Sequence, residues 1–427
     1  MKPKSGKKIF IPKKSKIALV CSGGAAKAGA FHVGVALALR EKGFRFLGGL
    51  KDQDTNNRAD SAESPNSDTL KLADNSGRTI SIYVGSSAGS ILSAYLASGF
   101  TLDEIFDSFL NGSKSKNLKP LSYYQLFSLR KDKGILSTFA NLAGGDYESP
   151  LKSFIANLAR ESYESIFQKR WLKFSGIFST AGIEKYLREQ VLPSNDFERY
   201  KADLFIVGTQ LNHSRKVVFG RYDYKSIAED RSCLYMNDVP VSQAAAASTA
   251  LPPIFAPWPI KKENGKTTYY FDGEIRDTLS THVAFDGGAD LIIASYTHQP
   301  YHFHKDIGSL HLYGMPTIVI QALYLMIERK IQQHRQTIDR NRITYDTISD
   351  YFKEHDLPET HRKHCLEALE LKLSFKRSVD YVFIHPKARD HEMFFGDHFN
   401  LSTSALKETV RLGFKSAIDV LRRYEFE

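Results

Sequence analysis

The amino-acid sequence predicts an α/β fold, and two segments of similar design carry that prediction. The first is an apolar run at 17–21 that leads through glycines and alanines into a helical pattern at 35–39. The second is a β-type run at 79–84, which is followed by the pentapeptide 85–89 (Gly-Ser-Ser-Ala-Gly) and a helical pattern at 91–96. Short apolar runs that pass through small residues into a 3.6-residue period are typical of strands that feed helices.

The pentapeptide has the pattern G-x-S-x-G and places Ser87 at the apex of a sharp turn between strand and helix. Gly85 and Gly89 lack the Cβ atoms that would clash in so tight a turn. The Ser87 hydroxyl would stand clear of the sheet, and the first turn of the next helix would direct free N–H groups toward developing negative charge. Ser87 is therefore the candidate nucleophile, and an ordinary Gly/Ser-rich turn is the alternative.

A second loop, at 22–34, is rich in glycine and alanine and follows the predicted strand at 17–21. Small residues let backbone amides approach a ligand, which fits a phosphate or the oxyanion of acyl transfer. The loop lacks both the Gly-Lys-Ser/Thr ending of a P-loop and the strict G-x-G-x-x-G of a dinucleotide site. Beside a nucleophile elbow, an oxyanion hole is the simpler interpretation. Its candidate amides belong to Gly23, Gly24, Ala25 and Ala26.

The candidate acid is Asp272, which heads the tripeptide 272–274 (Asp-Gly-Glu). It stands at the end of the second strand of a predicted hairpin, at 267–271. Asp286 has similar neighbours, but it leads directly into another predicted strand at 289–293 and is interpreted as a turn residue. We therefore favour Asp272 over Asp286.

Together these segments resemble the patatin-like phospholipase family. That family has a glycine-rich oxyanion loop after its first strand, a G-x-S-x-G elbow, and a D-G-G/A motif carrying the acid of a Ser–Asp dyad. This chain has counterparts in the same order, and further similar segments at 247–255 and 288–290. The resemblance covers residues 17 to 296, with a weaker match at 381–386. It implies a three-layer α/β/α patatin-like domain with a mainly parallel central sheet.

The chain departs from the family pattern at two motifs. Ala25 and Ala26 stand where the family usually has glycine, and Lys27 lies one position before the family's usual basic residue. In the dyad motif, Gly273 is followed by Glu274 instead of glycine or alanine, which adds a negative charge near the site. None of these departures removes a reacting side chain.

The resemblance implies a lipid acyl hydrolase, and phospholipase A-type cleavage is the leading expectation. Asp272 would take the proton of Ser87 directly, and an acyl-enzyme would form and then be hydrolysed by water. A carboxylate at its ordinary pKa of about 4 is a poor base at neutral pH, so partial burial should help by raising the pKa. No cofactor is implied, and a protein activator is left open. A neutral-lipid or soluble-ester hydrolase, or a catalytically silent lipid-surface binding protein, is the alternative.

A Ser–Asp–His triad on an α/β-hydrolase fold is the rival mechanism. The candidate histidines all follow the candidate acid in the chain: His282, His298, His302 and His304. That fold normally places several strands before the nucleophile, whereas one clear strand precedes the elbow's own strand here, which favours the dyad. His32, beside the glycine-rich loop, is predicted to be a packed helix residue.

The composition, 42% hydrophobic and 25% charged over 427 residues, is ordinary for a soluble globular protein. The three cysteines are far apart, which predicts no disulfide framework and mildly favours a reducing compartment. The group His361, His364 and Cys365 lies in a polar helical stretch and is predicted to be a solvated face, so no metal site is expected. No run approaches the roughly 20 apolar residues that span a bilayer. No Sec-type signal peptide is recognised.

The net charge of +10 is concentrated in a basic N-terminal arm at 1–16, which has seven lysines. Such an arm could bind an anionic membrane surface at roughly 1 kcal/mol per cation. A disordered solubilising tail is the alternative, and nucleic acid is a less expected partner. These features predict a protein located in the cytoplasm or at the surface of a membrane, with phospholipid or another acyl-ester lipid as its substrate.

The predicted catalytic domain spans 17–300 and is interrupted at 51–78 by a flexible insertion rich in Asp, Asn and Ser. Residues 102–200 are expected to be mainly helical, with a possible lid or acyl-binding contribution. Strands are expected at 202–208 and 216–219.

The C-terminal region, 301–427, is predicted to be mainly helical, with a late strand at 381–384 and a closing helix at 402–423. Within it, the segment 316–326 is strongly apolar. Packing in the core is the preferred interpretation of that segment, and a lid or interfacial helix is the alternative.

Overall fold

The computed structural model describes residues 8–51, 78–111, 117–129, 176, 178–222, 233–262, 265–276 and 278–427. The predicted insertion at 51–78 therefore lies almost wholly outside the described residues. The same holds for much of the mainly helical stretch expected at 102–200, of which residues 112–116 and 130–175 are not described.

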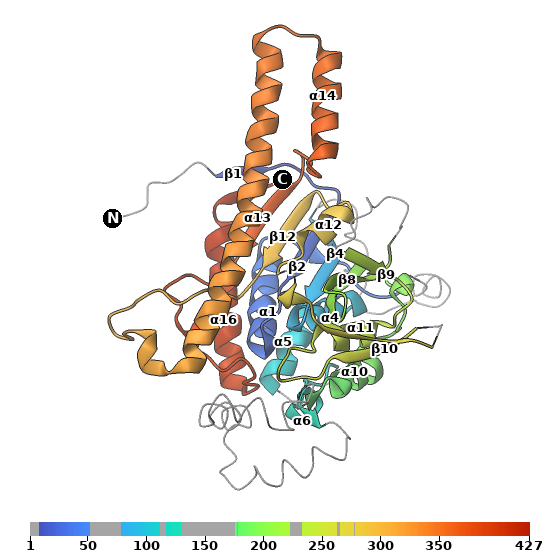
Figure 1. The fold of residues 1–427 in the computed structure, drawn as a ribbon, viewed down its shortest axis with the longest axis vertical. Coiled ribbons are helices and arrows are strands. Elements are labelled where there is room, and N and C mark those ends of the chain that lie inside the picture. The colour runs from blue at the N-terminus through green and yellow to red at the C-terminus, as the bar shows by residue number, and fades with distance from the viewer. Residues whose placement is uncertain are drawn as a thin grey trace, which may run out of the picture.

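A ten-stranded, mostly parallel sheet lies at the centre of the fold (Figure 1). Its main order is β10-β11-β7-β4-β2-β12-β13, with β3 beside β4, β8 also beside β7, and β9 beside β8. The strands are β2 (Ile17–Cys21), β3 (Arg45–Phe46), β4 (Thr79–Ser86), β7 (Asp203–Gln210), β8 (Arg215–Gly220), β9 (Cys233–Met236), β10 (Trp258–Lys261), β11 (Thr267–Asp272), β12 (Leu291–Ser295) and β13 (Asp380–Ile384). Only the β10–β11, β11–β7 and β7–β8 pairs among these described strands are antiparallel. The predicted α/β class is confirmed.

Helices cover both faces of this sheet. The principal ones are α1 (Ala25–Glu41), α4 (Ala88–Ser98), α5 (Leu102–Asn111), α6 (Tyr123–Leu126), α10 (Ala181–Tyr186), α11 (Val241–Ser248), α12 (Thr281–Asp286), α13 (Met315–Glu354), α14 (Glu359–Lys372), α15 (Glu392–Phe395) and α16 (Thr403–Leu421). Shorter helical turns are η3 (Leu187–Val191), η4 (Phe197–Arg199), η6 (Gly273–Ile275) and η7 (Leu310–Tyr313). A small sheet pairs β5 (Ser128–Leu129) with β6 (Phe178–Ser179).

Two apolar clusters, one on each face of the sheet, give the fold three layers. On one face, Leu19 of β2 packs in a core shared with α1, α4, α11 and α16. On the other face, Val20 packs with Val283 of α12 and Ile331 of α13. Successive side chains of a strand point to opposite faces, so neighbouring residues of β2 can serve both cores. The predicted three-layer arrangement is confirmed.

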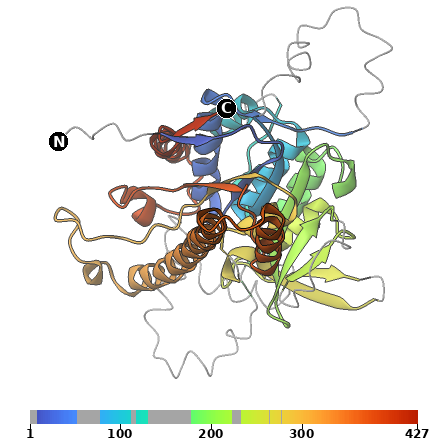
Figure 2. The same ribbon diagram turned by 90° about the horizontal axis from the view of Figure 1, so that it is seen from above.

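The C-terminal region is mainly helical and adds β13 to the sheet, as predicted, and α16 closes the fold. α13 and α14 form a hairpin that projects from the body in Figure 1, and the view from above in Figure 2 shows the two helices side by side. His361, His364 and Cys365 lie on α14, and all three are exposed, which confirms the predicted solvated face. No helix in the described ranges is both long and apolar enough to cross a bilayer.

The apolar segment at 316–326 lies at the surface, so the preferred prediction that it packs in the core is wrong. It forms the first turns of α13, where Tyr324 is buried but Val319 and Leu323 are each about half exposed. The helix turns its other face toward the body, and periodicity alone does not show which face of a helix meets a neighbour.

The N-terminal segment joins the fold from residue 9. β1 (Ile9–Ile11) pairs in parallel with β14 (Tyr424–Phe426). Lys14 and Lys16 form ion pairs of 2.8 and 3.0 Å with aspartates of β13 and β7. These two lysines are held within the fold and do not belong to a free basic arm, which corrects that part of the prediction; residues 1–7 lie outside the described ranges.

α1 and α16 meet backbone to backbone at two glycines. A Cβ atom on Gly34 would collide with the carbonyl oxygen of Val410, and one on Gly413 would collide with the carbonyl oxygen of Phe31. Interiors are packed too densely to absorb such an overlap without a shift of the helices. This contact fixes the closing helix against the helix that follows the glycine-rich loop.

We predict that Gly34→Ala destabilises the protein by about 1–3 kcal/mol, the usual cost of overpacking. Gly29→Ala, in the same helix, is the matched control, because the nearest atom to its added Cβ is Ala88 Cβ at 3.9 Å. That change should be neutral or should stabilise by up to about 1 kcal/mol, because alanine is the better helix former. Urea unfolding followed by circular dichroism measures both effects, and equal effects of the two changes would contradict the role given to the helix contact.

Candidate active site

The pentapeptide forms the predicted strand–turn–helix. Ser87 lies between β4 and α4 with φ of 51° and ψ of −123°, a backbone conformation that non-glycine residues rarely adopt. A Cβ on Gly85 would collide with the carbonyl of Gly89, and a Cβ on Gly89 would collide with the carbonyl of Cys21. Both glycines are therefore required by close backbone approach, as the sequence indicates.

Ser248 holds this strained turn and is a residue that sequence reasoning missed. Its hydroxyl accepts a hydrogen bond from the Ser87 amide at 2.8 Å and donates one to the carbonyl of Val207 at 2.6 Å. On the other side, the Ser90 hydroxyl donates to the Ser87 carbonyl at 2.6 Å. The only signal for Ser248 is its place in the segment at 247–255.

Asp272 reaches Ser87 because of strand register. Ser86 at the end of β4 pairs with Val207 of β7, and Asp272 at the end of β11 pairs with the next residue of β7, Gly208. Gly273 lets the chain turn here, because a Cβ on it would collide with the Val207 carbonyl. Elements nearly 190 residues apart in the chain are thereby brought to one level of the sheet.

The carboxylate of Asp272 is buried and accepts the amide of Glu274 at 2.9 Å. Burial has the largest effect on the pKa of Asp272 and raises it from 3.8 to about 6. The Ser87 side chain lies close enough to this carboxylate to oppose that rise in pKa. The group is therefore a carboxylate at neutral pH, and a stronger base than an exposed aspartate.

The alternative acid and the histidines of the rival triad lie elsewhere. Asp286 is exposed at the end of α12 and accepts a hydrogen bond from the Tyr235 hydroxyl at 2.8 Å. His282 contacts Lys216, and His298 lies behind the glycine-rich loop. The remaining two histidines are exposed in the segment after β12.

The glycine-rich loop packs against the elbow. A Cβ on Gly23 would stand 2.8 Å from Ser87 Cβ and 2.6 Å from Cγ of Glu274. Gly24 and Ala25 both have positive φ, 128° and 57°, and α1 begins at Ala25. Within the described chain, the amides of residues 23–26 donate no hydrogen bond. They are available to a ligand beside Ser87.

His32 fixes this loop from behind. Its Nε2 lies 3.0 Å from the Ser22 carbonyl and its Nδ1 lies 2.7 Å from the Ser295 hydroxyl. Burial lowers the pKa of His32 to about 4, so the ring is neutral at physiological pH. A neutral ring has one N–H, so Nε2 donates to the carbonyl and Nδ1 accepts from the hydroxyl. The prediction that His32 is a packed helix residue is confirmed.

Lys27 points away from Ser87 into the C-terminal region. Its Nζ donates to the Met393 carbonyl at 2.6 Å and lies 3.3 Å from Nε2 of His398. Burial lowers the pKa of Lys27 to about 7. This lysine therefore anchors the segment 393–398 on α1 and does not contribute its ammonium group to the space in front of Ser87.

Glu274 is buried on the other side of the turn. Its Oε1 accepts a hydrogen bond from the hydroxyl of Ser86, the neighbour of Ser87. Its stem fills the space beside Gly23, where a Cβ would meet it. The residue that departs from the family pattern thus links the end of β4 to the turn after β11.

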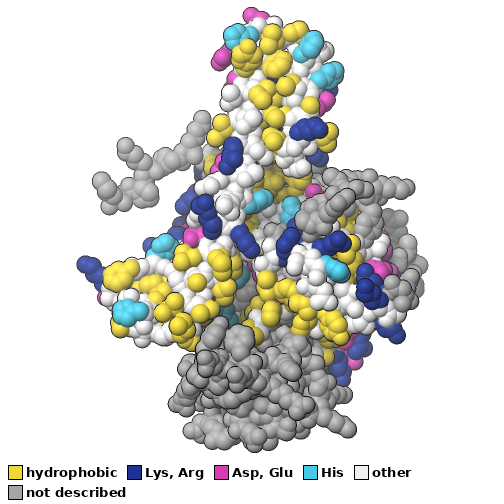
Figure 3. Space-filling model, viewed as in Figure 1, with side chains coloured by type: hydrophobic (Ala, Val, Ile, Leu, Met, Phe, Trp, Pro, Cys, Tyr) yellow, Lys and Arg dark blue, Asp and Glu magenta, His cyan; other side chains and the backbone are white. Residues whose placement is uncertain are grey.

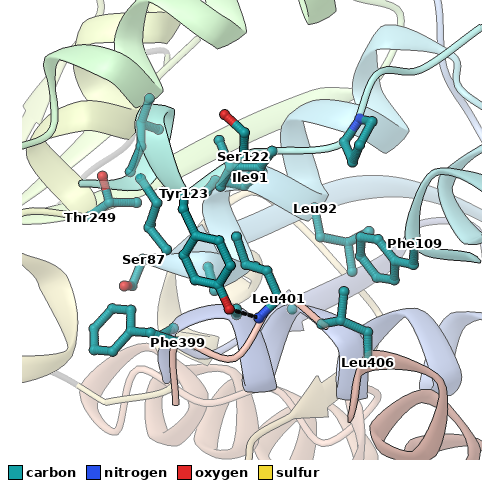
Figure 4. A pocket seen from close by; sticks show the side chains of 18 of the residues that line it. Ser87, Ile91, Leu92, Phe109, Ser122, Tyr123, Thr249, Phe399, Leu401 and Leu406 are labelled. Carbon is teal, nitrogen blue, oxygen red and sulfur yellow. Dashed lines mark hydrogen bonds between the residues drawn. The ribbon is translucent and has the colours of Figure 1, made fainter. Parts of the chain in front are cut away.

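A cavity of about 360 Å³ opens in front of Ser87, and its lining is mostly apolar (Figure 4). Figure 4 shows Ser87 on one side of the cavity and Phe109 and Leu406 on the opposite side. Its walls come from α1, α4, α5, α6 and α16 and from the segments around them. The volume lies within the range of about 300–1,000 Å³ that is usual for small-molecule sites.

Part of the cavity wall comes from beyond the predicted catalytic domain, 17–300. Phe399, Leu401 and Leu406 all line it. The Leu401 amide donates to the Tyr123 hydroxyl at 2.8 Å, which ties this wall to α6 (Figure 4). Sequence reasoning missed these residues, because isolated apolar residues far from the motifs carry no local signal.

Comparison with protein-family models identifies one match. The model of the patatin-like phospholipase family matches residues 19–285, more than half of the chain. The matched range includes the glycine-rich loop, Ser87 and Asp272. A search among curated proteins found no match to the chain. The chain belongs to the patatin-like phospholipase family, whose members act on the acyl esters of lipids.

Proposed function

We propose that this protein is a phospholipase A-type enzyme that cleaves acyl esters through a dyad of Ser87 and Asp272. The observation that carries the proposal is that strand register places Ser87 beside a buried carboxylate whose pKa is raised to about 6 and which responds to the Ser87 side chain. The nucleophile and its base therefore meet without an intervening imidazole. An apolar cavity opens beside the same serine.

In the proposed reaction, the Ser87 Oγ attacks the ester carbonyl carbon as its proton passes to Asp272. The carbonyl oxygen becomes an oxyanion, which accepts hydrogen bonds from amides of residues 23–26. One such donor is typically worth about 3–4 kcal/mol of barrier. Asp272 then protonates the departing alcohol oxygen, which leaves an acyl-enzyme. Water attacks that ester while Asp272 takes its proton, and the fatty acid leaves with Ser87 restored.

The apolar lining supports a substrate with a hydrocarbon chain. The lining includes Ile91 and Leu251, and Phe109 and Leu406 lie on the side opposite Ser87. Such a lining gains free energy by taking an acyl chain out of water, at about 0.8 kcal/mol per CH₂ group. The net charge of +10 favours phospholipid, whose headgroup carries a phosphate, over a neutral lipid.

The first prediction concerns the dyad itself. Ser87→Ala and Asp272→Asn should each reduce fatty-acid release from mixed phospholipid vesicles by about 10³-fold or more, as loss of a nucleophile or its base usually does. Asp286→Asn is the matched control, because this exposed carboxylate lies away from Ser87. Full activity of Asp272→Asn, or an equal loss in Asp286→Asn, would refute the dyad.

The same samples separate reactivity from substrate class. Wild-type protein should react with a fluorophosphonate probe at Ser87, and Ser87→Ala should not. If the protein is labelled and cleaves a short soluble ester but releases no fatty acid from phospholipid, the dyad is retained and the phospholipase assignment is overturned. Vesicle binding without labelling or turnover would favour a catalytically silent lipid-binding protein.

The second prediction concerns pH. Because Asp272 must be ionised to accept a proton and its pKa is about 6, kcat/KM should rise through pH 6 and stay level up to pH 8. The rate on a soluble ester, measured from pH 4.5 to 8, tests this. A midpoint near 4, the value of an exposed aspartate, would contradict the role of the buried carboxylate.

The third prediction concerns stability. The pKa of Asp272 is higher in the folded chain, about 6, than its ordinary 3.8, so the folded state binds more protons between these values and stability falls as pH rises through them. Above pH 6 the buried charge is fully present, and Asp272→Asn removes it. Asp272→Asn should therefore be more stable at pH 7.5, by up to about 3 kcal/mol. The gain should shrink toward pH 4 in urea unfolding; a constant difference would contradict it.

The fourth prediction concerns acyl-chain length. Phe109 closes the side of the cavity opposite Ser87 (Figure 4), so Phe109→Ala should shift the preference toward longer acyl chains and Phe109→Trp toward shorter ones. A series of nitrophenyl esters of increasing chain length measures kcat/KM for each. Opposite shifts in the two variants support the acyl site; a parallel loss at every chain length would indicate a folding defect instead.

A further inference from the structure

An apolar surface outside the cavity has no part in the site described above. It covers the segment after β12 and the first three turns of α13, and we refer to residues 303–326 as the apolar knob. Phe303, Leu312 and Met315 are the most exposed of its large side chains, at 67–72% of their area. Figure 3 shows the knob as a yellow patch at the lower left, and Figure 1 shows that this part of the chain projects from the body.

The helical part of the knob is apolar on its outer face. At 100° per residue, Met315, Val319, Leu323 and Met326 fall on one side of α13, opposite Tyr324. The four outer side chains are between 48% and 67% exposed, whereas Tyr324 is buried. A helix that served only to cover the body would bury its apolar face and expose its polar face.

Polar contacts fix the inner face. The Tyr324 hydroxyl lies 2.6 Å from Nε2 of His398. The side chain of Gln321 accepts the Tyr301 amide at 2.8 Å and donates to the Tyr301 carbonyl at 3.0 Å. Tyr301, Tyr324 and Phe394 form a small apolar cluster of their own beneath the knob. The outward orientation of the apolar side chains is therefore held by specific contacts.

The charge pattern of the knob identifies the kind of surface that would accept it. Residues 307–327 contain no Asp, Glu, Lys or Arg. Charged residues border this stretch at both ends, with Lys305 and Asp306 before it and Glu328, Arg329 and Lys330 after it, so cations outnumber carboxylates by three to two. Dark blue groups stand at the edge of the yellow patch in Figure 3. An apolar surface with cations at its margin complements a bilayer, whose headgroups are polar or anionic and whose interior is hydrocarbon.

We propose that the apolar knob docks the protein on a lipid bilayer that contains anionic headgroups, with its outer side chains inserted below the headgroup level. The inference rests on the proposed function in one respect: a lipid substrate would be met at that surface. The projecting shape of the knob suits insertion into lipid better than contact with a rigid protein surface, which would need a matching hollow.

The docking surface is connected to the cavity through one residue. Tyr324, on the inner face of the knob helix, contacts His398, and His398 is the chain neighbour of Phe399 in the cavity wall. The knob helix and the cavity wall are therefore joined by one contact and one step along the chain.

The experiment uses Ser87→Ala protein, so that binding is measured without hydrolysis. Sedimentation with phosphatidylcholine vesicles, with and without phosphatidylglycerol, gives the partition coefficient. The double change Leu323→Glu and Met326→Glu should lower partition by roughly tenfold or more, because it removes apolar insertion and adds like charge to the lipid. The matched control is Ile343→Glu with Leu371→Glu, which alters side chains 67% and 78% exposed on the projecting hairpin.

Each outcome decides the proposal. Loss of vesicle binding in the knob variant, with binding retained in the control, supports docking through the knob. Absence of binding by the parent protein, or equal binding by both variants, overturns it. Conversion of a dimer to a monomer by the knob changes, seen in sedimentation velocity without lipid, overturns it in favour of a second copy of this chain.

Activity measurements with Ser87 intact keep docking and catalysis apart. The knob variant should cleave a short soluble ester at the wild-type rate. Its release of fatty acid from phospholipid vesicles should fall by the same factor as its binding to them. If the wild type cleaves neither substrate while the knob variant alone loses vesicle binding, the proposed function fails and the docking surface stands.

Discussion

The close placement of Ser87 beside the buried carboxylate of Asp272 is the constraint that the arrangement of the sheet satisfies. It requires β4 and β11 to end at one level on either side of β7, which the register of Ser86 with Val207 and of Asp272 with Gly208 provides. A change of one residue in either register would turn the side chains to the opposite face of the sheet. The parallel sheet and its antiparallel edge are therefore necessary for this pair to meet.

The same contact costs stability. Ser87 holds a strained backbone conformation, and the carboxylate of Asp272 is removed from water, which raises its pKa. Lys27 is a second buried titratable group nearby, with a lowered pKa for the same reason. Two apolar clusters and the close crossing of α1 and α16 offset these costs. A site of this kind is expected to gain stability when its charge is removed and to lose its chemistry in the same step.

Local patterns in the sequence predict the strand at 17–21, the turn at Ser87 and the position of Asp272, because tight turns and strand ends impose their residue types over a few positions. They do not predict Ser248, which hydrogen-bonds the Ser87 amide, or Phe399, which lines the cavity. A single residue in either role leaves no pattern in the sequence. The apolar run at 316–326 shows the limit most clearly. Its hydrophobic residues are spaced as a helix requires, but burial depends on what packs against that helix, and this helix turns the side that carries Gln321 and Tyr324 inward.

The C-terminal region contributes directly to the cavity beside Ser87. Lys27 and Tyr324 both contact Nε2 of His398, and the chain then runs through Phe399 to Leu401, which Tyr123 holds against α6. One short segment therefore carries a wall of the cavity in front of Ser87 and receives the inner face of the helix that forms the apolar knob. The cavity wall and the exposed surface thus share one support.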